Sequence, residues 1–123
     1  MLNRAQKFGK QSELLASHYL RLSGYNVLEL NYRNWIGEID IIARDGPVLV
    51  FIEVKARKTT RFGSPKNAVT PGKQKKISKT ALAYLKETGQ LNSRARFDVV
   101  AIDARHDPPE IEVVKNAFEL VCR

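Results

Sequence analysis

Residues 37–55 constrain the fold of this chain more than any other stretch. Two runs rich in Ile and Val flank an Asp-Gly dipeptide at residues 45–46. Ile and Val favour a pleated, buried surface, and Asp-Gly favours a type I′ turn because both central residues of that turn take positive φ. The sequence therefore predicts a β-hairpin at the centre of the protein, around which the other elements have to pack.

Three ionisable residues interrupt this apolar hairpin: Asp40, Glu53 and Lys55. Acidic residues are depleted in strands, and an unpaired buried carboxylate is costly. With a turn at residues 45–46, Asp40 lies diagonal to Glu53 on the same face of the sheet, and Glu38 lies opposite Glu53. Lys55 shares that face because side chains alternate with period two. The hairpin is therefore expected to bring two carboxylates and a lysine together.

This arrangement suits metal-assisted hydrolysis of a phosphodiester. Two carboxylates at close range repel each other, and a divalent cation such as Mg²⁺ neutralises both. Mg²⁺ takes one or two carboxylates, keeps several waters and accepts phosphate oxygens from a substrate. Lys55 could then orient or activate a metal-bound water. The competing interpretation is an ordinary ion pair of Glu53 with Lys55 on a half-exposed strand. The combination of Asp40, the turn, Glu53 and Lys55 in one hairpin is more specific than a Glu-x-Lys tripeptide and favours the catalytic interpretation.

Length and composition set outer bounds on the protein. The 123 residues suit one domain, residues 1–123. No run of 18 apolar residues occurs and the N-terminus has no apolar signal core, so a cytoplasmic protein without membrane contact is expected. Cys122 is the only cysteine, which excludes an internal disulfide. His18 and His106 do not have zinc-ligand spacing and are expected to be surface or packing residues.

The net charge is +8, and the positive charge is concentrated in one segment. Residues 54–86 contain no Asp or Glu. Such a stretch suits a phosphate backbone, although a solvated basic face is the alternative. Polyanion binding is favoured because the segment begins where the carboxylate hairpin ends. The candidate nucleic-acid-binding residues in it are Arg57, Lys58, Arg61, Lys66, Lys73, Lys75, Lys76 and Lys79.

A helix is predicted over residues 3–22, before the hairpin. Its apolar stripe, with residues recurring every three or four positions, consists of Phe8, Leu15, Tyr19 and Leu22, widened by Ala16 and Leu20. Glu13 lies at the edge of this stripe. Its carboxylate could reach over the core face toward a neighbouring site, or it could be an ordinary solvated residue; its position favours neither.

The remaining elements predict a mixed sheet flanked by helices, an α/β architecture. Strands are expected at residues 25–30, 96–103 and 110–115, a second helix at 70–87, and a short helical cap at 116–120. Thr70-Pro71 is a strong helix start, with Thr as the N-cap and Pro at the first helical position. The strand–helix–strand order from residue 48 to residue 103 requires a crossover, which predicts a parallel pair of strands.

Two connectors and one strand residue have open interpretations. Residues 31–37 combine two aromatic side chains with Arg33, which could grip nucleic acid, but packing of this loop onto the core is favoured. Residues 56–70 form a long basic connection beside Lys55 and are a candidate substrate-gripping loop. Asp98 either forms a salt bridge with Arg94 or Arg96 or supports the carboxylate site.

As a set, these motifs resemble the PD-(D/E)XK nuclease superfamily and, within it, the YraN family of uncharacterised bacterial proteins. The resemblance covers nearly the whole chain. The residues that carry it are Glu13, Gly24-Tyr25, Gly37-Glu38-Ile39-Asp40, Asp45-Gly46, Phe51-Ile52-Glu53-Val54-Lys55, Phe62-Gly63, Ala68-Val69, Lys73-Gln74, Arg96-Phe97-Asp98-Val99-Val100 and Asn116-Ala117-Phe118.

The resemblance implies a restriction-endonuclease-like core, a mixed β-sheet with helices on both sides. It implies Asp40 and Glu53 as ligands of Mg²⁺ or Mn²⁺ and Lys55 as the catalytic lysine. Archaeal Holliday-junction resolvases carry a glutamate in the first helix, which corresponds to Glu13. Gln74 stands where some relatives have a polar site residue. The chain departs from these relatives in having Ser12 in place of a glycine, and Ile39 in place of the proline of the superfamily name.

The function expected from these observations is a metal-dependent endonuclease that cuts DNA, including branched or structured DNA. The carbonyl of Val54 is a candidate further metal ligand. DNA is favoured over RNA as the partner, and a homodimer would suit resolvase-like cutting of two strands. Two alternatives remain open: a non-catalytic nucleic-acid-binding module on a nuclease-like fold, and a protein-interaction adaptor.

Overall fold

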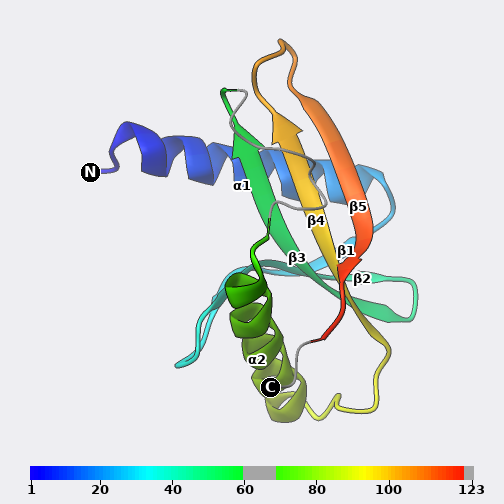
Figure 1. The fold of residues 1–123 in the computed structure, drawn as a ribbon. Coiled ribbons are helices and arrows are strands. Elements are labelled where there is room, and N and C mark those ends of the chain that lie inside the picture. The colour runs from blue at the N-terminus through cyan, green and yellow to red at the C-terminus, as the bar shows by residue number, and fades with distance from the viewer. Residues whose placement is uncertain (60–68, 121–123) are drawn as a thin grey trace.

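A five-stranded sheet lies between two helices in this structure, a computed structural model that describes residues 1–59 and 69–120. In Figure 1, α1 passes behind the sheet and α2 stands in front of it. The elements in chain order are α1 (Arg4–Leu22), β1 (Asn26–Arg33), β2 (Glu38–Asp45), β3 (Val48–Arg57), α2 (Pro71–Glu87), β4 (Ala95–Asp103) and β5 (Glu110–Phe118). The predicted α/β architecture is confirmed.

The strands are arranged in sequence order, β1-β2-β3-β4-β5, so β1 and β5 form the two edges. The β3–β4 pair is parallel and the other three pairs are antiparallel. The predicted crossover is correct, and α2 makes it. Because a crossover helix returns the chain to the start of the next parallel strand, α2 begins near the carboxyl end of β3. The residues at that end of β3 therefore face the first turn of α2.

Each face of the sheet has its own apolar core. Phe51 packs under α2 with Ile77 and Tyr84, whereas Ile52 packs under α1 with Leu20. Neighbouring residues of β3 thus point to opposite helices, as the pleat of a strand requires. The same alternation sends Glu53 toward α2, as the next residue after Phe51 on that face. The sheet is fixed by these two cores, so the position of Glu53 is fixed with it.

The predicted apolar stripe of α1 is only partly correct. Ala16 and Leu20 are fully buried, but Leu22 is 76% exposed and Tyr19 lies at the surface. Ser12 and Ser17 are buried instead, and their hydroxyls donate to the helix's own Phe8 and Leu14 carbonyls. Because those internal bonds satisfy the hydroxyls, small polar residues can face the sheet, and the helix is rotated relative to the prediction.

The hairpin turn lies one residue later than predicted. Asp45 pairs with Val48, so the two-residue loop is Gly46-Pro47. Asp45 is kept in the strand by Arg96, whose Nη2 lies 2.9 Å from its carboxylate, and Gly46 supplies the positive φ of the turn. The later turn changes the cross-strand partner of each hairpin residue by two positions. An even change keeps every side chain on its predicted face, so Asp40 and Glu53 still share a face.

The C-terminal segment is a strand where a helical cap was expected. β5 continues to Phe118, whose ring stacks on that of Phe97 at a centroid distance of 4.8 Å. Asn116 has a positive φ of 54° beside an irregularity in the β4–β5 pairing, which re-aims the end of the strand toward Phe97. Similarly, β1 extends to Arg33, beyond its predicted end at residue 30. None of the described helices has the length and apolar content needed to cross a membrane.

Candidate active site

The structure brings the carboxylates of Asp40 and Glu53 together between β2 and β3. Ile41 pairs with Ile52, so Asp40 and Glu53 are the next opposed residues along the hairpin. Asp40 Oδ2 accepts a hydrogen bond of 2.8 Å from the Val54 backbone N–H, and Asp40 also shares a hydrogen bond with Glu53. Two carboxyl groups at this distance repel each other when both are ionised, which favours a proton on one of them.

The Glu53 carboxyl group is buried and has a strongly raised pKa. Its residue is only 8% exposed. Burial, the hydrogen bond to Asp40 and the charge of Asp40 together raise the pKa of Glu53 to about 8, and the charges of Lys73 and Lys55 only partly offset these effects. Glu53 therefore holds its proton more tightly than an ordinary glutamate does. Perturbed carboxylates of this kind are concentrated at functional sites.

Two lysines complete the group around Glu53. Lys73 Nζ, from the first turn of α2, lies 3.6 Å from Glu53 Oε2. Burial lowers the pKa of Lys73, but the negative charge of Glu53 and the contact with Lys55 outweigh burial and raise it. Burial and the charge of Lys73 lower the pKa of the Lys55 ammonium. The site thus contains one lysine that resists deprotonation and one that releases its proton more easily.

Sequence reasoning placed Lys73 among the phosphate-binding residues and missed its position against Glu53. Thr70 is the N-cap of α2, and its side chain accepts from the Lys73 N–H, which puts Lys73 in the first helical turn. A crossover helix begins near the carboxyl end of the preceding strand, where Glu53 lies. The Thr70-Pro71 start signal, combined with the crossover, was therefore sufficient to find this contact.

Glu13 approaches the carboxylates from the α1 side. It is half-buried, and burial together with the charge of Asp40 raises its pKa. Its carboxylate hydrogen-bonds to Asn31, which has a positive φ of 54°. Asn is among the few non-glycine residues that tolerate this conformation, and such backbone outliers often occur at functional sites. Of the two readings left open for Glu13, the structure supports the one that reaches toward a neighbouring site, and it adds Asn31.

A cavity of about 220 Å³ opens beside these residues, lined by Ser12, Glu13, Val54 and Lys55 among others. The model of the uncharacterised protein family UPF0102 matches residues 12–102, a span that includes the carboxylate pair and the part of the cavity wall formed by Ser12, Glu13, Val54 and Lys55. The chain belongs to this family.

Curated relatives of the UPF0102 chain are similar to it over most of their lengths. A UPF0102 protein of Desulfosudis oleivorans is 49% identical over 119 residues, 97% of this chain and 95% of the relative. UPF0102 proteins of Syntrophus aciditrophicus and Geobacter sulfurreducens are 52% and 51% identical over 113 residues, in each case 91% of this chain and 88% of the relative. These relatives confirm the family expected from the motifs, and membership of the PD-(D/E)XK superfamily stays a prediction.

Gln74 has a different neighbourhood from the other predicted catalytic residues of this UPF0102 protein. Its Nε2 donates to the Val69 carbonyl at 3.0 Å, which fixes the entry into α2. The side chain is half-buried in this position. The structure therefore gives Gln74 a contact that orients α2, and so Lys73, while Lys73 itself contacts the carboxylate pair.

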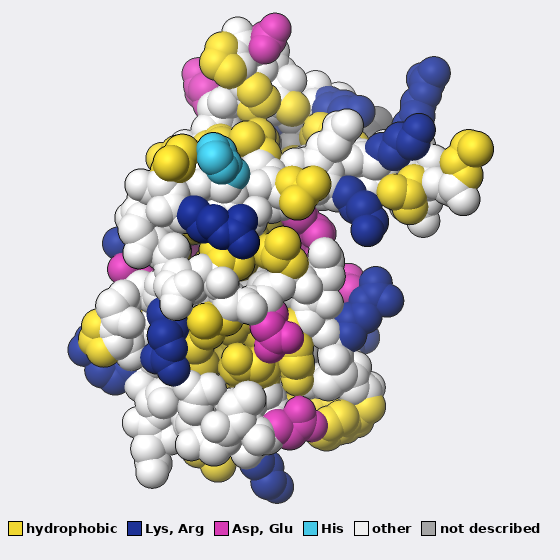
Figure 2. Space-filling model, turned by 180° about the vertical axis from the view of Figure 1, so that it is seen from behind, with side chains coloured by type: hydrophobic (Ala, Val, Ile, Leu, Met, Phe, Trp, Pro, Cys, Tyr) yellow, Lys and Arg dark blue, Asp and Glu magenta, His cyan; other side chains and the backbone are white. Residues whose placement is uncertain are grey.

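The predicted nucleic-acid-binding residues fall into three groups. Arg57 is ion-paired with Asp103 at 3.1 Å, and Lys58 Nζ lies 4.2 Å from the centre of the Phe8 ring. Lys75, Lys76 and Lys79 are exposed on α2, and so is Lys73, which also lies 3.6 Å from Glu53. Arg61 and Lys66 lie outside the described residues, as does most of the predicted substrate-gripping loop. On the α1 side of the molecule, Lys and Arg are spread over the surface with Asp and Glu among them (Figure 2).

A second group of possible metal ligands lies at the turn between β4 and β5. Ligand atoms of Asp103, His106 and Glu110 lie within 4.8 Å of one another. However, Arg105 Nη2 and Arg57 Nη2 lie 2.6 Å and 3.1 Å from Asp103 Oδ2. The Arg105 side chain thereby holds the pKa of Asp103 well below its usual range. Asp103 is already charge-compensated, in contrast to the carboxylate pair of Asp40 and Glu53.

Proposed function

We propose that this UPF0102 protein is a metal-dependent endonuclease that hydrolyses phosphodiester bonds of DNA, with branched or structured DNA as the favoured substrate class. The observation that carries the proposal is the close pair of Asp40 and the buried Glu53 beside two lysines, in which burial and Asp40 raise the pKa of Glu53 to about 8. The resemblance of Glu13, Asp40, Glu53 and Lys55 to the PD-(D/E)XK pattern supports the same chemistry.

The donor set suits Mg²⁺ or Mn²⁺. Two carboxylates and the neighbouring Val54 carbonyl are hard oxygen ligands, which these ions prefer. One Asp40 oxygen accepts from the Val54 N–H, which leaves the other oxygen of this carboxylate for a cation. A divalent ion held by both carboxylates would neutralise their charges and remove the repulsion between them. When bound, the ion supplies a water of lowered pKa and charge stabilisation at the phosphate.

The two lysines have different roles in this proposal. Lys55 has a lowered pKa and lies beside the carboxylates, which suits it to orient the attacking water and to accept its proton. Lys73 keeps its charge, so it stabilises negative charge at the phosphate once Glu53 is occupied by a metal ion. Glu13, held by Asn31, contributes a further acceptor on the α1 side of the same water.

Replacing Lys55 with alanine is expected to lower DNA cleavage by at least about a hundredfold, because a positioned proton acceptor contributes roughly 10²–10⁴-fold to such reactions. Wild type and Lys55→Ala would be incubated with Mg²⁺ or Mn²⁺ and labelled four-way junction, flap, duplex and single-stranded DNA, and RNA. Products would be separated on denaturing gels and complexes on native gels. DNA binding at low salt is expected to survive in the variant.

The matched control is Lys86→Ala, which removes the same charge from an exposed position in the last turn of α2. It is expected to cleave like wild type. A mobility shift of wild type and Lys55→Ala without cleavage by either would replace the enzyme with the nucleic-acid-binding module. The absence of both cleavage and a shift would favour the protein-interaction adaptor.

A further inference from the structure

The loop between β1 and β2 exposes the indole of Trp35. This side chain is 76% exposed, although tryptophan is usually largely buried in folded proteins. Packing of the connector onto the core was the favoured expectation, and it holds for Tyr32, whose ring meets that of Tyr84 edge-on at 5.1 Å. It is wrong for Trp35. The indole ring is therefore accessible to a ligand, and exposed aromatic rings are the groups on which unpaired bases stack in proteins that bind single-stranded nucleic acid.

The loop that carries Trp35 is internally braced by Asn34. The Asn34 amide oxygen accepts from the N–H groups of Ile36 and Gly37, and its Nδ2 donates to the Thr80 carbonyl on α2. The Asn34 N–H also donates to the Gly37 carbonyl. These bonds fix both flanks of Trp35 without covering its ring. A preorganised aromatic residue loses little conformational entropy when a ligand stacks on it.

Gly37 sets the distance between this loop and α2. A Cβ atom added at Gly37 would lie 3.0 Å from Thr80 Oγ1 and 3.3 Å from Lys76 Cε. Only a glycine permits this close approach without a shift of α2. The position of Trp35 is therefore tied to α2, the same helix that brings Lys73 to Glu53.

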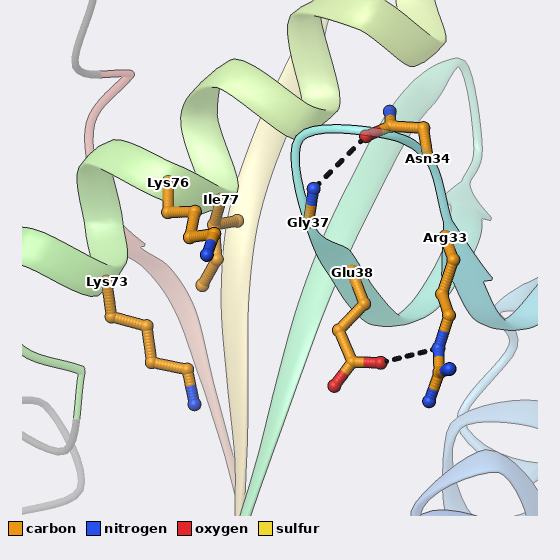
Figure 3. Close-up of a pocket in the computed structure, with 7 residues that line it drawn as sticks. All are labelled: Arg33, Asn34, Gly37, Glu38, Lys73, Lys76 and Ile77. Atoms are coloured by element: carbon orange, nitrogen blue, oxygen red, sulfur yellow. Dashed lines mark hydrogen bonds and ion pairs between the residues drawn. The ribbon is translucent and has the colours of Figure 1, made fainter.

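A cavity of about 450 Å³ lies between the loop and α2. Figure 3 shows Lys73 and Lys76 extending from α2 on one side, with Arg33 and Glu38 on the other. Glu38 is ion-paired with Arg33 at 2.9 Å, so the two lysines remain as positive charges facing the cavity. Lys73 also contacts Glu53. The cavity is thus lined by two lysines of α2, one of which also contacts the carboxylate pair, and on its other side by residues of the loop that bears Trp35.

We propose that Trp35 stacks on an unpaired base of the DNA and that Lys73 and Lys76 hold the phosphates between this base and the scissile bond. Bases inside a duplex are stacked on each other and present no free face, whereas a flap, a bulge or a single strand does. The inference rests on the proposed function and specifies its substrate class: DNA with an unpaired nucleotide next to the cut.

Trp35 is the only tryptophan of the chain, so its fluorescence reports this contact directly. The protein would be titrated in EDTA, where no cleavage occurs, with a 5′-flap DNA and with a continuous duplex of the same length. Flap DNA is expected to quench the Trp35 emission in step with binding, and the duplex is expected to bind without this quenching. Flap binding that leaves the emission unchanged would overturn the inference, as would a lack of binding to any DNA at low salt.

Substitutions at position 35 test whether stacking determines the preference. Trp35→Leu keeps an apolar side chain but no aromatic ring, and it is expected to bind flap DNA roughly tenfold more weakly, with little change for duplex. Trp35→Phe is expected to retain most of the preference. Leu91→Ala, at an exposed position distant in sequence, is the control and should match wild type. An unchanged flap-to-duplex ratio in Trp35→Leu would contradict the proposal.

Cleavage with Mn²⁺ on the same DNAs separates the two proposals. If wild type cleaves and Trp35→Leu keeps the same flap preference, the proposed function stands and the stacking inference fails. If Trp35 is quenched by flap DNA but no DNA is cut, stacking stands and the nuclease assignment fails.

Discussion

Replacing Asp98 with alanine is expected to lower the free energy of unfolding by about 3 kcal/mol or more, because it removes one partner from a buried charged network. Asp98 is fully buried. Its carboxylate accepts from Arg96 Nε at 2.8 Å, from the Tyr25 hydroxyl at 3.1 Å and from the Asn116 N–H at 2.9 Å. Burial and the charge of Asp98 raise the pKa of Tyr25 to about 12, so that hydroxyl remains a donor. Urea unfolding followed by circular dichroism would measure the loss.

The control is Asp103→Ala on the same strand. Asp103 also has arginine partners, but they lie at the surface, where solvent screens the pairs, so a much smaller loss is expected. Asp98→Asn should fall between the two, since it keeps the shape and loses the charge. If Asp98→Ala and Asp103→Ala were equally stable, the network would contribute little and the apolar cores alone would hold β4 to α1 and β5.

The hairpin, and the face of the sheet that Asp40 and Glu53 share, could be predicted because both depend on residues close together in the sequence. Alternation with period two places Asp40 and Glu53 on one face. This prediction is correct even though the turn lies one residue later than predicted. The turn itself could not be located from residues 45–46 alone. It is set by the ion pair of Asp45 with Arg96, residues 51 positions apart, and no local pattern contains that contact.

The distinction between local patterns and contacts distant in sequence also explains the other differences between the predicted and the observed structure. Arg96 was one of two expected partners of Asp98, but Tyr25, 73 residues away, was not foreseen. The segment after residue 115 has a helical local preference, whereas the stacking of Phe118 on Phe97 keeps it in the sheet. Lys73 differs from these cases. Its contact with Glu53 followed from the cap and the crossover, both of which are visible in the sequence.

Between pH 5.5 and pH 8, the metal-free protein is expected to lose about 3 kcal/mol of stability through Glu53. The pKa of Glu53 is about 8 in the folded protein, against an ordinary value of 4.5. A raised folded-state pKa gives stability that is fully present below the unfolded-state value and is lost as the pH rises through the folded-state value. Chemical unfolding in EDTA across this pH range would measure the slope.

Glu53→Gln isolates this contribution, because the variant cannot ionise at position 53 and keeps Glu13, Lys55 and Lys73. It is expected to show a flatter pH profile and to be more stable than wild type at pH 8 without metal. Saturating Mg²⁺ should then raise the stability of wild type at pH 8, by about 2.7 kcal/mol at a hundredfold excess over the dissociation constant, and leave Glu53→Gln nearly unchanged. Parallel pH profiles would show that Glu53 is ionised in the folded protein. In that case its charge is compensated by Lys73 and Lys55, and the electrostatic argument for a metal ion at the pair would no longer hold.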